Sequence, residues 1–178
     1  MIYSIKKFLG LLMLVIFVSF SVAQNTSSVR YLEFNDLSGE KVTFNEFKGE
    51  ITVINFWATW CAACLKEMPE LQKISQDFAD NQVRVVGIVV MSDTGKIEQM
   101  IKLTKISYPV FVGTRQNLQN ISHSLIIPQT IILNEQGRIL KKFEGAQNYK
   151  VIANFLNDYL NRIKLTRHNE NSQELLKE

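Results

Sequence analysis

The chain has 178 residues, of which 21% are charged and 46% hydrophobic, as expected for one globular domain rather than a disordered segment. Its formal net charge of +3 comes from 20 basic and 17 acidic residues, with no dense basic run. The composition therefore gives no support to nucleic-acid binding, and we expect no nucleic-acid partner.

Residues 1–23 have the pattern of a secretory signal peptide. Two lysines precede the apolar run Phe8–Phe20, and the small residues Ser21 and Ala23 stand at positions −3 and −1 of a cut before Gln24. The run of about 13 residues is shorter than the roughly 20 that span a bilayer, and an uncleaved N-terminal anchor is the alternative. In either case the lysines keep the amino end in the cytoplasm, which predicts a periplasmic or other extracytoplasmic domain.

The first elements after the leader point to a hairpin, a strand and a helix. Residues 24–30 read as a polar linker, and two alternating runs around a Ser-Gly turn predict a β-hairpin over Tyr31–Phe44. Ile51–Trp60 is β-rich and apolar throughout, as a strand buried on both faces would be. From Leu65 to Phe78 apolar residues recur at spacings of three and four, which predicts an amphipathic helix.

The second half of the chain continues this alternation. The pattern predicts strands over Val83–Met91, Tyr108–Gly113, Ile126–Leu133 and Gly137–Gly145, helices over 97–106 and 151–160, and a helical turn around Asn117–His123. Alternating strands and helices imply parallel strands with crossover helices, and the last two strands add an antiparallel edge. We therefore expect one α/β domain over residues 31–163, with a central mixed sheet flanked by helices, and a frayed polar tail over 164–178.

The only two cysteines, Cys61 and Cys64, lie in the stretch WCAACLKEMP between the buried strand and the helix. A structural disulfide there would close a loop of about four residues and contribute only roughly 2 kcal/mol. A zinc site usually needs four ligands, and the only histidines, His123 and His168, are isolated and far apart in sequence. A two-thiolate Cu(I) site, as in a copper metallochaperone, is a further alternative because soft thiolates suit that ion.

A redox pair is the interpretation that the surrounding elements favour. Cys61 falls at or near the amino end of the helix, where free N–H groups and the helix dipole stabilise a thiolate. Cys64 lies one turn further on the same face, within reach of the first sulfur. This arrangement suits attack by Cys61 on a partner disulfide and resolution of the mixed disulfide by Cys64, and it needs no cofactor.

The segments NFWATWCAACLKEMPEL, from Asn55, and IIPQTIIL together resemble the thioredoxin fold, and are most similar to TlpA/ResA-like thiol–disulfide oxidoreductases. The likeness runs from about Tyr31 to Leu160. It implies that Cys61 is the nucleophile, Cys64 the resolving thiol and Trp60 the aromatic residue beside the active site. The early hairpin resembles the amino-terminal extension of that family, and a short insert precedes the strand that IIPQTIIL opens.

The same resemblance assigns roles to two prolines. Pro69 matches a proline inside the active-site helix, and the alternative is a helix that simply starts later. Pro128 matches the cis-proline that faces the cysteines in this fold. Ile127, just before it, would then offer its backbone to an extended substrate strand.

Two positions differ from thioredoxin itself. Asn55 stands where thioredoxin has a buried acid, and a neutral amide cannot take a proton from the resolving thiol. Glu67 follows Cys64 by three residues, as in TlpA/ResA-like proteins, so its carboxyl could approach the thiols. Our hypothesis is that Glu67 handles the proton or shapes the substrate groove; the alternative is a solvated glutamate near a helix start.

By resemblance, the expected function is reduction of disulfides in partner proteins outside the cytoplasm, for example apocytochromes in cytochrome c maturation. Electrons would come from a membrane thiol carrier. A thiol oxidant is an alternative, because Ala62 and Ala63 between the cysteines do not fix the potential. A peroxide reductase is a second alternative within redox chemistry, but it would need a threonine and an arginine around the Cys61 thiolate, and the sequence shows no such cluster near it.

Overall fold

The computed structural model describes Val29 and residues 32–175. The leader expected over residues 1–23 lies outside these residues, as does the linker apart from Val29. No helix within the described part of the chain is both long enough and apolar enough to cross a membrane.

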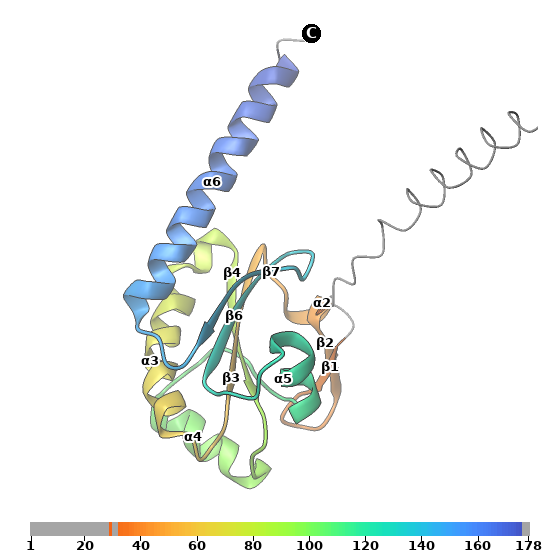
Figure 1. Cartoon of the computed structure of the whole chain (residues 1–178), viewed down its shortest axis with the longest axis vertical. Helices are drawn as coiled ribbons and strands as arrows, with labels where there is room; N and C mark the ends of the chain where they lie inside the picture. The colour runs from red at the N-terminus through yellow and green to blue at the C-terminus, as the bar shows by residue number, and fades with distance from the viewer. Residues whose placement is uncertain (1–28, 30–31, 176–178) are drawn as a thin grey trace, which may run out of the picture.

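A seven-stranded mixed sheet with the strand order β2-β1-β5-β4-β3-β6-β7 forms the centre of the molecule (Figure 1). Its strands are β1 (Glu33–Asn35), β2 (Lys41–Thr43), β3 (Ile51–Trp57), β4 (Val83–Val89), β5 (Val110–Val112), β6 (Gln129–Asn134) and β7 (Ile139–Glu144). β3 runs parallel to β4 and antiparallel to β6, and every residue of β3 is buried. The sheet confirms the predicted fold class and explains why β3 is apolar along nearly its whole length.

Helices cover both faces of the sheet (Figure 1). The face with α3 (Ala62–Asp77), α4 (Ile97–Thr104) and α6 (Tyr149–Leu175) encloses one apolar core, to which both cysteines belong. The other face, with α2 (Phe44–Phe47) and α5 (Arg115–Ser122), encloses a second core. The alternating side chains of β3 reach both cores, so this strand joins the two layers.

The predicted N-terminal hairpin is present and extends the sheet at one edge. β1 and β2 pair antiparallel, and the Asp36 carboxylate accepts the backbone N–H groups of Ser38 and Glu40 in the turn between them. Gly39 adopts a φ of 93°, a conformation that favours glycine. β1 joins β5 through the pair Asn35 and Val112.

Three helical segments differ from the sequence expectation. The turn expected around Asn117–His123 is a helix of eight residues, α5, whose Thr114 cap accepts the backbone N–H of Asn117. α2 was not expected, because four residues are too few to show a helical period. The tail expected to fray from Lys164 instead continues α6 as a helix to Leu175, since no glycine or proline interrupts it.

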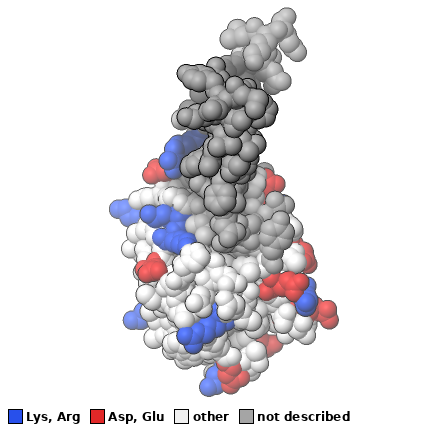
Figure 2. All heavy atoms as spheres, turned by 45° about the vertical axis from the view of Figure 1, so that its right-hand side comes forward, with Lys and Arg blue, Asp and Glu red and all other residues white. Residues whose placement is uncertain are grey.

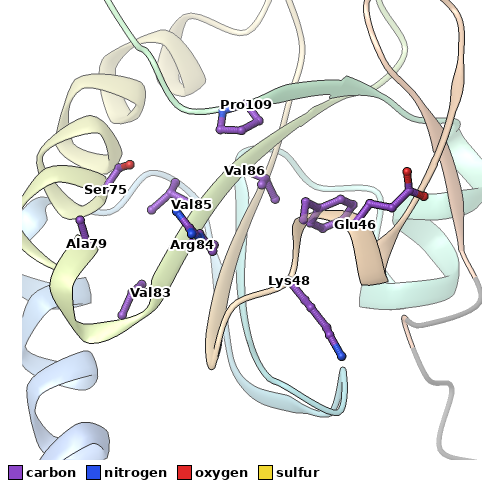
Figure 3. Close-up of a pocket in the computed structure, with 10 residues that line it drawn as sticks. Glu46, Lys48, Ser75, Ala79, Val83, Arg84, Val85, Val86 and Pro109 are labelled. Atoms are coloured by element: carbon purple, nitrogen blue, oxygen red, sulfur yellow. The ribbon is translucent and has the colours of Figure 1, made fainter.

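One stretch of the β4 edge is open, because β5 pairs only with Gly87–Val89. A pocket of about 300 Å³ lies beside that edge, between the end of α3, β4 and Pro109. Figure 3 shows Val83, Arg84 and Val85 along β4, with Ser75 near the end of α3 and Ala79 in the short 3-10 helix that follows it. A proline and an exposed arginine at such an edge discourage pairing with another chain, and neither cysteine lines this pocket.

Charged side chains of both signs are scattered over the face in Figure 2. The described residues on that face form no extended patch of one sign. This distribution agrees with the small net charge of +3 and adds no support for a polyanionic partner.

Candidate active site

The two cysteines form a disulfide at the amino end of α3. Cys61 is the N-cap residue of this helix, and its sulfur accepts the backbone N–H of Cys64 at 3.2 Å. Cys61 is 7% exposed and Cys64 is fully buried, so Cys61 is the more accessible sulfur. A sulfur at the positive end of a helix, with an N–H directed at it, is stabilised as a thiolate when the disulfide is reduced.

Glu67 lies one turn below Cys64 on α3 and is buried, with 1% of its surface exposed. Three donors hold its carboxylate: Asn55 Nδ2 at 2.8 Å, Thr130 Oγ1 at 3.1 Å and the backbone N–H of Gln147 at 3.0 Å. The alternative of a solvated glutamate near a helix start is therefore wrong. The helix turns this side chain toward the sheet, because Glu67 follows Cys64 by three residues.

Burial dominates the electrostatics of this carboxyl. Desolvation raises the pKa of Glu67 above its ordinary value, and the hydrogen bonds from Gln147, Thr130 and Asn55 offset part of that rise. A carboxyl with a raised pKa, one helical turn from Cys64, can exchange protons closer to neutral pH than a free glutamate.

The sheet brings the partners of Glu67 together through strand register. Asn55 of β3 stands opposite Thr130 of β6 on one side and Gly87 of β4 on the other. Asn55 Nδ2 donates to both Thr130 Oγ1, at 3.0 Å, and the Glu67 carboxylate. The position that carries a buried acid in thioredoxin here carries an amide that holds an acid contributed by the helix.

The side-chain amide of Asn55 has an unused hydrogen-bond acceptor. Its Oδ1 is buried and accepts no hydrogen bond from a described group. A carboxamide carries two donors and one acceptor oxygen, so rotation by half a turn would present Oδ1 to a protonated Glu67. Asn55 can therefore satisfy both the ionised and the protonated form of the carboxyl.

Two aromatic residues complete the buried surroundings. A Cβ added to Gly87 would lie 3.0 Å from Trp57 Nε1 and 3.3 Å from Tyr108 Cε2, so both rings pack over this glycine. Burial, and secondarily the nearby charge of Glu67, raises the pKa of Tyr108 far above its usual value. The Tyr108 hydroxyl therefore remains protonated at any pH at which the protein functions.

A short connection links Glu67 to the loop before β6 that contains Ile127 and Pro128, here called the proline loop. The Ile127–Pro128 peptide bond is cis, as predicted. The Pro128 carbonyl accepts the N–H of Gly145, and two residues later the Gln147 N–H donates to Glu67. The segment between β7 and α6 thus contacts both the active-site helix and the proline loop.

The remaining residues that the sequence analysis singled out differ in their exposure. Trp60 is 65% exposed, and its indole N–H donates to the Met91 carbonyl at 2.8 Å. Ile127 is partly buried and packs against the core cluster that contains both cysteines. Pro69 lies inside α3, so the alternative of a helix that starts after it is wrong.

Sequence patterns missed two members of the site. Thr130 is a polar residue within a buried strand, a signal that could have drawn attention to it. Gln147 contributes only its backbone N–H, which no side-chain pattern can reveal. Among the described residues there is no group of three or more histidine, cysteine or acidic side chains that could hold a metal ion.

Fold and site together define a thiol–disulfide oxidoreductase: a cysteine pair at a helix start on an α/β sheet, with a buried acid beneath it and a cis-proline in the chain. Comparison with known proteins agrees. The model of the Redoxin family matches residues 22–157, and the chain belongs to this family.

Relatives with assigned names carry the same activity. The chain is 24% identical over 144 residues to the thiol–disulfide oxidoreductase ResA of Bacillus subtilis, covering 81% of this chain and 78% of that protein. It is 25% identical to ResA of Halalkalibacterium halodurans, over 68% of this chain and 69% of that protein. The crystal structure of StoA from Bacillus subtilis is similar with a TM-score of 0.56 and 26% identity, over 68% of this chain and 92% of that one.

A secreted Mycobacterium tuberculosis disulfide oxidoreductase, described as homologous to Escherichia coli DsbE, shares the fold. Its TM-score is 0.60 at 18% identity, over 74% of this chain and 96% of that one. These likenesses confirm the resemblance to ResA-like oxidoreductases and the use of Cys61 and Cys64 as the redox pair.

Proposed function

We propose that this chain reduces disulfides in partner proteins outside the cytoplasm, with Glu67 as the proton-handling group. The observation that carries the proposal is the buried Glu67 carboxyl, one helical turn from Cys64 and held by three donors. The direction of electron flow is supported by the similarity to ResA-like proteins. An extracytoplasmic location is supported by the leader pattern over residues 1–23.

The reaction begins at Cys61. Its thiolate attacks one sulfur of the partner disulfide, a bond forms between the two sulfurs, and the other partner sulfur leaves and takes up a proton. Cys64 then loses its proton, attacks the Cys61 sulfur and releases the second partner thiol. Two electrons pass to the partner, and the protein ends with the Cys61–Cys64 disulfide.

Glu67 serves the second step in this mechanism. The fully buried Cys64 thiol has no solvent nearby to accept its proton, so a carboxylate one turn away is a suitable base. Desolvation, which raises the pKa of Glu67, increases its basicity. A membrane thiol carrier would then reduce the Cys61–Cys64 disulfide and restore both thiols with their protons.

Trp60, Ile127 and Pro128 would bind the substrate in this scheme. Trp60 is the largest exposed apolar side chain next to Cys61, and its ring is fixed by the hydrogen bond to Met91. Ile127 would offer backbone groups to an extended segment of the partner, as strand addition does.

A disulfide-containing model substrate tests the direction. A peptide with the haem-attachment pattern Cys-X-X-Cys-His, oxidised to its disulfide, is mixed with the reduced protein, and thiols are alkylated and weighed at equilibrium. A reductant leaves most of the peptide as dithiol and most of the protein as disulfide. The reverse distribution would identify an oxidant and overturn the proposed direction.

A further inference from the structure

A groove between α3 and α4 opens close to the redox pair. It has a volume of about 470 Å³ and is lined by Leu65, Lys66, Pro69, Gln72, Leu103, Thr104 and Lys105. Leu103 is 67% exposed, which is unusual for a leucine on an otherwise well-packed domain. The groove shares no lining residue with the proline loop or with the carboxyl network of Glu67.

The surface of α3 connects this groove to the cysteines. Leu65 follows Cys61 by one turn, and its N–H donates to the Cys61 carbonyl. Ala62 is exposed and lies three positions before Leu65, so the helix carries no bulky side chain between them on that face. At 1.5 Å per residue, Leu65 and Pro69 lie about 6 and 12 Å along the helix from Cys61.

Hydrogen bonds within the protein hold Gln72, one of the lining residues, in place without a partner. Gln72 Nε2 donates to Ser107 Oγ at 3.0 Å, and the Ser107 N–H donates to Gln72 Oε1 at 2.7 Å. This double link holds the chain after α4 against α3. Pro69 has no N–H, so the usual helical hydrogen bond to the Leu65 carbonyl is missing at this point of α3.

Both charged residues that line the groove are lysines. Lys66 and Lys105 are exposed, and neither forms an ion pair in the described part of the chain. Glu67 and Glu70, the nearest acids on α3, are turned away and accept hydrogen bonds from Gln147 and Tyr149. The groove therefore presents an apolar wall and two cations that form no ion pair within the described part of the chain.

We propose that this groove docks a segment of the redox partner protein that carries an apolar side chain followed by carboxylates. The proposal rests on the proposed function, because the groove matters only when a partner cysteine is at Cys61. An extended chain advances about 3.3 Å per residue, so the docked residues would lie roughly two to four positions from the partner cysteine. The apolar side chain fills the space beside Leu103, and the carboxylates face Lys66 and Lys105.

Two synthetic peptides test this directly. Each has one intramolecular disulfide, followed after two residues by either Leu-Asp-Glu or Leu-Asn-Gln, and each oxidises the fully reduced protein. The reaction transfers two electrons and two protons from the Cys61–Cys64 dithiol to the peptide disulfide. The rate is followed by alkylation and mass measurement in low salt, about 0.02 M, and again at about 0.5 M.

The acidic peptide should react about five-fold faster than the amide peptide in low salt, and the advantage should shrink at high salt. Lys66→Gln combined with Lys105→Gln should abolish the advantage. The control, Lys96→Gln with Lys102→Gln, removes the same charge outside the groove and should retain it. Leu103→Ser should slow both leucine-bearing peptides relative to a peptide with serine in place of leucine.

A reaction with 4,4′-dithiodipyridine, a small disulfide that is uncharged at neutral pH, separates the two proposals. All variants should react with this small disulfide at the same rate, because it does not reach the groove. If they do, and the two peptides still react equally with the unaltered protein, the docking proposal is overturned and the exchange chemistry stands. If the unaltered protein fails to react with the small disulfide, the proposed function itself fails, and the docking proposal with it.

Discussion

At the scale of single residues, the proposed proton transfer depends on Glu67, a buried carboxyl one helical turn after Cys64 on α3. Replacing Glu67 with Gln removes the base but keeps the shape. The Gln oxygen can accept from Thr130 and Gln147, and a rotated Asn55 can accept from the new amide through its free Oδ1. The fold should therefore survive the change.

We predict that Glu67→Gln slows disulfide exchange by about 100-fold at neutral pH and removes the pH dependence that the carboxyl confers. Rates with a disulfide peptide, measured from about pH 5 to pH 9, check this, with circular dichroism as the test of folding. Rate profiles identical to the parent's would mean that Glu67 takes no part in proton transfer.

The carboxyl of Glu67 should also make the free energy of unfolding depend on pH. Because burial raises the pKa of Glu67, the folded oxidised protein binds the proton more tightly than the unfolded chain does. The contribution is fully present below the unfolded pKa and is lost as pH rises through the folded pKa. The free energy of unfolding of the parent should therefore fall over that window relative to Glu67→Gln, as urea titrations at several pH values can show. If the free energies of unfolding of the two proteins changed with pH in the same way, a raised pKa of Glu67 would be contradicted.

Asn55 should affect disulfide exchange only by changing the pKa of Glu67. Asn55→Leu removes the 2.8 Å donor to the carboxylate, so we expect the pKa of Glu67 to rise further and the pH profile of exchange to shift upward. Thr52→Val is the matched control, because Thr52 is on the same strand and its hydroxyl accepts a partly buried hydrogen bond from the Gly49 N–H without touching Glu67. An equal loss of rate in both variants with no shift of the profile would indicate a structural role only.

At the scale of elements, the turn before β3 determines where the central strand starts. A Cβ at Gly49 would lie 2.4 Å from the Gln82 carbonyl oxygen, a backbone atom that cannot move aside. Gly49→Ala should cost about 1–3 kcal/mol of unfolding free energy. Gly95→Ala, whose Cβ would meet only the Asp93 carboxyl oxygen at 3.4 Å, should change stability by less than about 0.5 kcal/mol. Chemical denaturation of both variants checks the difference, and equal stabilities would refute the close approach.

Element types were largely predictable from the sequence, because the apolar patterns of β3, β4 and α3 are long and regular. α2 and the end of α6 were not. α2 has only four residues. The sequence of the end of α6 has no apolar stripe, so only the lack of a breaking residue indicates that the helix continues.

The site was predictable only in part, for a physical reason. Cys61, Cys64 and Glu67 lie within two turns of one helix, so spacing alone relates them. Thr130 reaches Asn55 across 75 positions of sequence through the pairing of β6 with β3, and register is not visible in either strand alone. The burial of Glu67 likewise depends on the sheet that α3 covers.

At the scale of the whole molecule, the helix start, the central strand and the segment before α6 converge on one cysteine pair. The fold supplies the cap that favours a Cys61 thiolate and the enclosure that raises the pKa of Glu67. The α3–α4 groove lies beside this centre on the outer surface. Under the two proposals, proton transfer takes place on the buried side of α3, and the partner docks on the outer surface that leads from Cys61 to the groove.

The most direct test of this account is the redox titration of the Cys61–Cys64 couple in glutathione buffers, with thiols alkylated and the protein weighed at each potential. We predict a single reversible two-electron transition at about −250 mV or below, as expected of a reductant. A potential near about −120 mV would contradict the reducing direction. The absence of any reversible two-electron couple would contradict the central claim that this cysteine pair carries the activity.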